Sequence, residues 1–315
     1  MLPDRMTALA HPHPPSARRA PPGRGDVVYP AYWVAAAGLI GMTLMGVPLT
    51  QPAAALVFIG GGLPHGAYDI ALLRRSVALD RAGLWLAIGG YVAIAVLMVA
   101  LWMTLPLIAL VVFLAVASVH FGEDWPMLEE PLLRFAAGAA VIAAATLGHP
   151  AEVSTLFVAM SDPRAAIIAQ IITAAAPVAL LVTAVGVALA WRDGSRHWAA
   201  AMSLCLVLLV ILPPVAGFAL FFVFLHSPRH LAQTRSALHD MSLGRWIGTG
   251  ALLSGLAILG WWGLRGFVSS HVDASLVAQA FQLLASVAVP HLLLSRWIER
   301  RLIAVPYSHE KTSTP

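Results

Sequence analysis

Residues 53–73 read AAALVFIGGGLPHGAYDIALL, an apolar run that is interrupted by glycines, a proline, a histidine and an aspartate. A run of about 20 mostly apolar residues can cross the hydrocarbon core of a bilayer as one helix. Polar and helix-breaking residues are tolerated in such a helix where they are buried in protein or line a cavity. Gly60, Gly61 and Gly62 would permit a neighbouring helix to approach closely, and Pro64 would loosen the helix just before His65. The stretch therefore predicts a membrane-spanning helix that lines a buried site.

The rest of the chain also has the composition of a membrane protein. Of its 315 residues, 59% are hydrophobic and only 11% are charged, and the mean hydropathy is +0.81. A soluble domain carries roughly 25% charged residues. We therefore expect an all-α, polytopic integral membrane protein.

About ten apolar runs are long enough to be membrane-spanning helices. They lie near residues 31–49, 53–73, 83–103, 105–121, 131–147, 165–190, 198–212, 214–231, 246–264 and 275–297. Because several runs are short or interrupted by Gly or Pro, eight or nine helices are alternatives. The expected organisation is a disordered cytoplasmic tail over residues 1–28, a transmembrane helical domain over 29–300 and a second cytoplasmic tail over 301–315.

The distribution of positive charge predicts the orientation of the chain. With the N-terminus inside, the cytoplasmic segments hold all of the 19 Lys and Arg residues except Arg164 and Arg265. Cytoplasmic loops of membrane proteins carry such an excess. We therefore expect a multi-pass protein of the cell inner (cytoplasmic) membrane with both termini cytoplasmic. The same clustering explains the net charge of +4 without a nucleic-acid partner.

Histidines gather in the expected spans. Of the twelve in the chain, those within or at the end of a span, all near the cytoplasmic side, are His65, His120, His226, His230 and His291. Ionisable side chains are expensive inside a bilayer, and they usually face the interior of the helix bundle. We therefore expect these histidines to form one functional site. A metal site, a proton relay and haem ligation are the alternatives at this point.

Carboxylates accompany two of the histidines at helical spacing. Asp69 follows His65 by four residues. Glu123 and Asp124 follow His120 by three and four residues. A carboxylate one helical turn away can accept the proton of the imidazole nitrogen that does not bind a metal. We therefore expect these carboxylates to orient the histidines.

The sequence HSPRH at residues 226–230 places His226 and His230 four residues apart. On a continuous helix both would lie on one face, whereas Ser227 could instead cap a new helix with Pro228 at its first position. Either geometry keeps the two histidines close. Several imidazoles with no thiolate nearby favour Fe, Zn or Cu over Mg or Ca, since the single Cys205 lies in a separate apolar run. A single ion fits this number of histidines better than a pair.

Four short motifs resemble, in order and spacing, those of the Brp/Blh family of bacterial and archaeal β-carotene 15,15'-dioxygenases. They are PHGAYD (64–69), HFGEDW (120–125), HSPRHL (226–231) and VPHLLL (289–294). The resemblance covers about residues 31–300. It implies a non-haem Fe(II) enzyme of the lipid bilayer that cleaves β-carotene with O2 into two molecules of all-trans-retinal. It also suggests a functional link to a retinal-binding opsin.

The resemblance implies a role for individual residues. The iron ligands and catalytic residues would be His65, His120, His226 and His230. The residues that would support these ligands or line the substrate pocket are Asp69, Glu123, Asp124, His291, Tyr68 and Phe121. Other aromatic residues close to the motifs that could line a tunnel for the carotenoid are Trp125, Phe221, Phe222 and Phe224.

Two other classes of function are compatible with the composition. A membrane hydroxylase or desaturase that acts on lipid would hold two metal ions, and it would need more histidine pairs at the spacing of HSPRH. A transporter, or an assembly factor for a retinal protein, would hold no iron, and the sequence has no internal repeat of the inverted-repeat transporter type. We favour the iron-dependent carotenoid dioxygenase.

Overall fold

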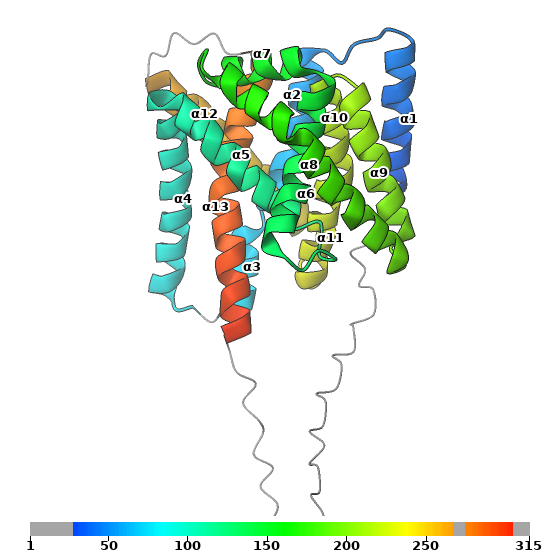
Figure 1. The fold of residues 1–315 in the computed structure, drawn as a ribbon. Helices are drawn as coiled ribbons and strands as arrows, with labels where there is room; N and C mark the ends of the chain where they lie inside the picture. The colour runs from blue at the N-terminus through cyan, green and yellow to red at the C-terminus, as the bar shows by residue number, and fades with distance from the viewer. Residues whose placement is uncertain (1–27, 78, 268–274, 305–315) are drawn as a thin grey trace, which may run out of the picture.

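The fold is that of a computed structural model, which describes residues 28–77, 79–267 and 275–304 (Figure 1). Throughout these residues the regular secondary structure is helical, and no strand occurs. The expectation of an all-α protein is therefore confirmed. The two predicted tails, 1–28 and 301–315, lie outside the described residues except for residue 28 and residues 301–304, which end the last helix.

The described residues form thirteen α-helices and one π-helical turn. In chain order these are α1 (Pro30–Leu44), α2 (Gln51–Gly66), α3 (Asp69–Ser76), α4 (Arg81–Thr104), α5 (Pro106–Gly122), α6 (Pro131–Gly148), α7 (Pro150–Met160), α8 (Ala165–Arg192), α9 (Arg196–Ile211), α10 (Pro214–Phe221), η2 (Phe222–His226), α11 (Ser227–Ala237), α12 (Leu243–Phe267) and α13 (Leu276–Ala304). Proline occupies the first or second position of several of them. Its fixed φ suits the first turn, where its missing N–H would have no partner within the helix.

Seven helices are long and apolar enough to cross a membrane, so the chain is a membrane protein. They cover Pro52–Ser76, Arg81–Thr104, Pro131–Gly148, Ala165–Arg192, Pro214–Ala237, Leu243–Gly266 and Leu276–Ile298. The expected count of about ten is not confirmed. Three of the expected spans form shorter helices, namely α1, α5 and α9 with 15, 17 and 16 residues. At 1.5 Å per residue such helices are at or below the length that crosses roughly 30 Å of hydrocarbon.

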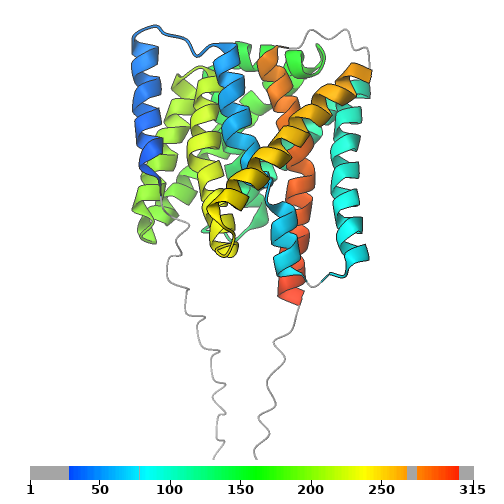
Figure 2. The same cartoon turned by 180° about the vertical axis from the view of Figure 1, so that it is seen from behind.

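The last helix, α13, lies inside the bundle, with α2, α4 and α5 packed against it (Figures 1 and 2). In the most apolar stretch of α13, 72% of the residues are buried, against 11% for α4 and for α12. Figure 2 shows α12 crossing the face of the bundle obliquely, and its upper end lies beside α4 in both views. Helices α4 and α12 therefore form an outer wall over the core that α13 occupies.

Glycines set the closest approaches between helices. A Cβ atom on Gly61 would lie 2.3 Å from Val223, and one on Gly62 would lie 2.4 Å from the ring of Phe222. The expected close approach at these positions is therefore confirmed, and it brings α2 against η2. At Gly60 a Cβ atom would meet nothing within 4 Å, so close packing does not explain that glycine.

A break after α2 and a π-helical turn before α11 lie next to three of the histidines. Pro64 lies inside α2, which ends at Gly66, and α3 begins at Asp69. In the HSPRH stretch the chain stays helical from η2 into α11, and Ser227 makes no side-chain cap. The continuous alternative predicted for this stretch is therefore the observed one, with a π-helical turn just before it. Such turns are rare and are frequent at functional sites.

Candidate metal site

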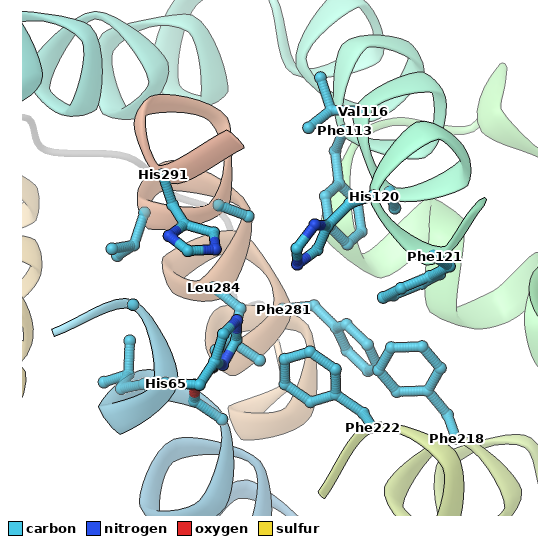
Figure 3. A pocket seen from close by; sticks show the side chains of 16 residues that line it. His65, Phe113, Val116, His120, Phe121, Phe218, Phe222, Phe281, Leu284 and His291 are labelled. Atoms are coloured by element: carbon cyan, nitrogen blue, oxygen red, sulfur yellow. Dashed lines mark hydrogen bonds between the residues drawn. The ribbon is translucent and has the colours of Figure 1, made fainter. Parts of the chain in front are cut away.

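Five histidines from α2, α5, η2, α11 and α13 gather at one place in the bundle, and Figure 3 shows three of them, His65, His120 and His291, around a pocket. The ring centroid of His226 lies 4.7 Å from that of His120 and 4.4 Å from that of His230. The ring centroid of His65 lies 5.3 Å from that of His291 and 6.1 Å from that of His120. The histidines singled out in the sequence are therefore neighbours, although their positions span more than two hundred residues.

Two carboxylates fix the imidazoles of His120 and His226. His120 Nδ1 lies 3.0 Å from Glu123 Oε2, and His226 Nδ1 lies 2.7 Å from Asp124 Oδ2. A carboxylate accepts a hydrogen bond, so each Nδ1 carries the proton and donates it. Each Nε2 atom then has a free lone pair, which is the form that binds a metal. Glu123 is a partner of His120, as its spacing predicted, whereas Asp124 contacts His226 in η2.

Asp69 supports His291 rather than His65, the partner that its spacing predicted. His291 Nδ1 lies 2.8 Å from both carboxylate oxygens of Asp69. His65 Nδ1 instead donates to the carbonyl oxygen of Gly62 at 2.5 Å. The reason is the break after Gly66, because residues four apart share a helix face only while the helix continues. Like His120 and His226, both histidines thus keep Nε2 free of the proton.

The imidazole nitrogens of His120 and His226 lie close enough together to bind one metal ion. Their Nε2 atoms are 3.0 Å apart. With both Nδ1 atoms protonated, two lone pairs face each other at this distance, an arrangement that a shared cation stabilises. Two imidazole nitrogens bound at right angles, each about 2.1 Å from one metal ion, are roughly 3.0 Å apart. His65, His120 and His226 each offer one ligand atom, and these atoms lie within 4.8 Å of one another. Because imidazole nitrogens suit transition metals, the residues present fit such an ion.

His230 lies beside this set in a different environment. Its Nε2 atom is buried without a hydrogen-bond partner among the described residues, and it is 3.8 Å from Asp124 Oδ1. Leaving a buried polar atom unpaired costs about 1–3 kcal/mol. His226, His230 and Asp124 also offer ligand atoms within 4.8 Å of one another. An ion bound here would satisfy the nitrogen that the protein leaves unpaired.

Two arginines adjoin the carboxylates that follow the C-terminal end of α5. Arg229 donates to the backbone carbonyl of Asp124 at 3.0 Å, and Arg296 Nε lies 3.4 Å from Glu123 Oε1. Burial raises the pKa of the Glu123 carboxyl, and Arg296 opposes this shift. Burial also acts to raise the pKa of Asp124, but the imidazole of His226 outweighs it, so the pKa is below its usual value. Asp124 is therefore ionised and remains an acceptor.

A small apolar cavity of about 40 Å³ adjoins the histidines (Figure 3). His65, His120 and His291 form one side of it. The aromatic rings on its other side are Phe113, Phe121, Phe218, Phe222 and Phe281. Such a lining suits a ligand with little hydrogen-bonding capacity.

Sequence reasoning found two of these rings and missed three. Phe121 and Phe222 were expected, whereas Phe113, Phe218 and Phe281 were not. A signal existed for Phe218, because it precedes Phe222 by four residues and the two rings stack with centroids 5.5 Å apart. Spacing also placed Phe281 on the face of α13 that carries Leu284, Ala288 and His291.

Some of the expected pocket residues lie elsewhere. The Tyr68 hydroxyl donates to the carbonyl of Trp246 at 3.0 Å, and its ring stacks on that indole at 3.7 Å. Trp125 packs edge-on against Trp198, 4.8 Å away. Tyr68 and Trp125 therefore tie neighbouring helices together and do not line the cavity. Phe221 and Phe224 are also absent from its lining, although the Phe221 ring packs behind it against His226.

The amino-acid sequence of the chain is similar to those of known proteins. The model of a family described as Beta-carotene 15,15'-dioxygenase matches residues 54–299, which include all five histidines. The Beta-carotene 15,15'-dioxygenase of uncultured marine bacterium 66A03 is 29% identical over 278 residues, covering 81% of this chain and 96% of that protein. The Probable beta-carotene 15,15'-dioxygenase Blh of Halobacterium salinarum is 27% identical over 295 residues, covering 79% of this chain and 83% of that protein. No solved structure matches the chain.

Proposed function

The chain belongs to the β-carotene 15,15'-dioxygenase family, and we propose that its histidine cluster holds one iron(II) ion for the reaction. As a member of this family it is a carotenoid-cleaving dioxygenase. Breaking the central double bond of β-carotene and adding one oxygen atom of O2 to each carbon gives two molecules of all-trans-retinal, so atoms and electrons balance. The observation that carries the proposal is the 3.0 Å distance between the Nε2 atoms of His120 and His226, whose Nδ1 atoms both contact carboxylates.

We assign the iron to His65, His120, His226 and His230. The first three offer nitrogens within 4.8 Å of one another, and the buried Nε2 of His230 has no hydrogen-bond partner among the described residues. Four neutral imidazoles hold a divalent ion without adding negative charge to a site inside the membrane. When bound, the ion supplies the binding and activation of O2.

His291 has a supporting place in this proposal. It lines the cavity with His65 and His120, and Asp69 orients its ring. We infer that it contacts the substrate or the edge of the metal site. His291→Ala would then lower retinal formation while iron stays bound, whereas loss of iron would make it a further ligand.

The protein supplies orientation and keeps water out. Asp124, Glu123 and Asp69 each hold an imidazole by its Nδ1 proton, which fixes the ring direction and its free nitrogen. The aromatic rings opposite provide flat apolar surfaces along which a polyene can lie. A carotenoid dissolves in lipid, and carrying it through water would cost about 25 cal/mol per Å² of exposed apolar surface. A site among membrane helices avoids that transfer.

We also propose the orientation that the Lys and Arg distribution predicts, with both termini on the cytoplasmic side of the inner membrane. Reporter fusions after residues 80, 195 and 300 should then read cytoplasmic, and a fusion after residue 155 should read exterior. A reversal at any of the first three would refute this topology. Retinal made at this membrane would be available to a retinal-binding opsin, a link that stays a prediction.

The test of the proposed function is expression in a bacterium that accumulates β-carotene. The cells should lose their orange colour, retinal should appear in the extract, and the purified protein should hold about one iron per chain. Alanine at each of the four ligand positions should abolish retinal formation and iron binding together. His197→Ala, at an exposed position in α9, is the matched control and should change neither.

Other outcomes of this experiment favour other functions. Two metal ions per chain and no retinal would indicate a lipid hydroxylase or desaturase. No iron and no retinal would indicate a transporter or an assembly factor. The iron assignment fails if two or more of the four alanine variants keep about one iron per chain.

A further inference from the structure

A second, larger cavity adjoins the histidine site on the side of α2 and α13. It has a volume of about 320 Å³, and residues of α2, α3, α4, α12 and α13 line it. Leu63, Gly66 and Val287 line both this cavity and the small one at the histidines. We call it the α4/α12 cavity. Because the two cavities share these lining residues, the α4/α12 cavity is next to the site where the reaction is proposed to occur.

The α4/α12 cavity lies against the outer wall of the bundle. Val92, Val96 and Leu256 line it, and 53%, 44% and 54% of their surfaces are exposed. They belong to α4 and to α12, which crosses the face of the bundle obliquely and meets α4 at its upper end (Figure 2). The cavity therefore lies directly beneath the outer wall that these two helices form.

A third cavity, of about 50 Å³, adjoins the histidine cavity from the opposite direction. Its walls share Phe113, Phe121, Phe218 and Phe281 with the histidine cavity. None of the residues shared with the α4/α12 cavity is among them. The three cavities therefore follow one another, and the histidines lie at the middle one.

Central cleavage requires this kind of arrangement. β-Carotene is symmetrical, so equal lengths of polyene, each ending in a ring, must extend from the two sides of the bond that breaks. Ligand cavities typically have volumes of about 300–1,000 Å³. Of the three, only the α4/α12 cavity reaches that range without movement of side chains.

We propose that the α4/α12 cavity holds one ring-bearing half of the carotenoid while the central double bond lies at the histidines. The inference rests on the proposed function and adds the binding place of one half of the substrate. Its lining is almost entirely apolar, as a hydrocarbon ring requires. The polar residues in the lining are Asp69, Tyr91, Ser254 and Ser286. Asp69 also holds His291, so the cavity reaches the support of the histidine site itself.

The test fills this cavity from α4. Ala95 lines the cavity, whereas Ala93, two residues away on the same helix, is exposed and lies outside the lining. Ala95→Phe and Ala93→Phe thus introduce the same ring at inward and outward positions. Iron per chain, β-carotene that co-purifies with iron-free protein, and retinal formation are measured for both variants and for the unmodified chain.

Ala95→Phe should keep its iron, retain several-fold less β-carotene and form retinal about 100-fold more slowly, the effect expected when a substrate is misplaced by an ångström or more. A shortened carotenoid aldehyde that lacks one ring should be cleaved at a rate within about threefold of the unmodified chain's, because it can place its ringless end here. Ala93→Phe should behave like the unmodified chain with both substrates.

The inference is overturned if Ala95→Phe binds and cleaves β-carotene like Ala93→Phe, or if it loses both substrates equally while keeping iron. If Ala95→Phe lost its iron through misfolding, Ala257→Phe fills the same cavity from α12 and decides by the same measurements. Absence of retinal from the unmodified chain would instead count against the proposed function, and β-carotene binding by iron-free protein would still test the cavity.

Discussion

Replacing Gly138 by alanine tests whether the contact between α5 and α6 holds His120 in place. A Cβ atom at position 138 would lie 1.9 Å from the carbonyl oxygen of Ser118 and 2.5 Å from the backbone nitrogen of Gly122. Both atoms belong to the backbone of α5, so no side-chain rotation can relieve the overlap. Restoring van der Waals contact requires the two helices to separate by roughly 1.5 Å.

The expected magnitude follows from the position of His120. It lies between Ser118 and Gly122 in α5, so a separation of the helices shifts its imidazole relative to His226, 3.0 Å away. Overpacking of this kind costs about 1–3 kcal/mol of stability. A catalytic group misplaced by about 1 Å can lower a rate roughly 100-fold. We therefore expect Gly138→Ala to lower the thermal stability, the iron content and the rate of retinal formation together.

The matched control is Gly89→Ala in α4, where a Cβ atom would meet nothing within 4 Å. There alanine should be neutral or should stabilise the helix by up to about 1 kcal/mol. Thermal unfolding, iron per chain and retinal formation in the β-carotene-accumulating host are compared for the two variants. If Gly138→Ala matched Gly89→Ala in all three, the close contact of α5 and α6 would not position the site.

Three further predictions concern the groups that hold the imidazoles and the metal itself. Asp124→Asn should weaken iron retention by roughly 10- to 100-fold, because His226 loses its charged acceptor; unchanged iron affinity by titration would contradict this role. Asp69→Asn should lower retinal formation by a similar factor while iron stays bound, because its partner is His291 and not a proposed ligand; loss of iron would make His291 a ligand. Removing iron with a chelator should stop retinal formation, and Fe(II) should restore it where Zn(II) does not; recovery with Zn(II) would refute iron dependence.

The histidine cluster could be predicted from the sequence because its members stand out from their surroundings. His65, His120 and His226 lie in segments that would otherwise be uniformly apolar, and burying them needs a reason. The same contrast revealed the accompanying carboxylates. Which histidine each carboxylate holds was only partly predictable. Asp69 contacts His291 and not His65 because α2 ends at Gly66, before Asp69. A spacing of four residues predicts a shared helix face only within one continuous helix.

Features made of ordinary membrane residues could not be predicted. Phe113 resembles any phenylalanine in an apolar helix, and only packing shows that it lines the cavity at the histidines. The α4/α12 cavity is formed by alanines, valines and leucines that are equally typical of a lipid-facing surface. The short helix α7 was missed for a related reason, since its 11 residues fall between two expected spans.

The π-helical turn at Phe222–His226 has a consequence for which changes in chain length the site can accept. A π-helical turn behaves as one residue inserted into an α-helix. A π-helical turn takes about one residue more than an α-helical turn to go once round the axis, so deleting one residue here would leave a regular helix with everything after it in nearly the same angular position. An insertion or deletion in the regular helix α10 has no such compensation, and it would rotate everything after it by roughly 100° about the helix axis. His226 and His230 would then point away from His65 and His120, although no histidine had been changed. The angular phase of this helix, which the π-helical turn preserves, is thus as much a part of the metal site as the ligands themselves.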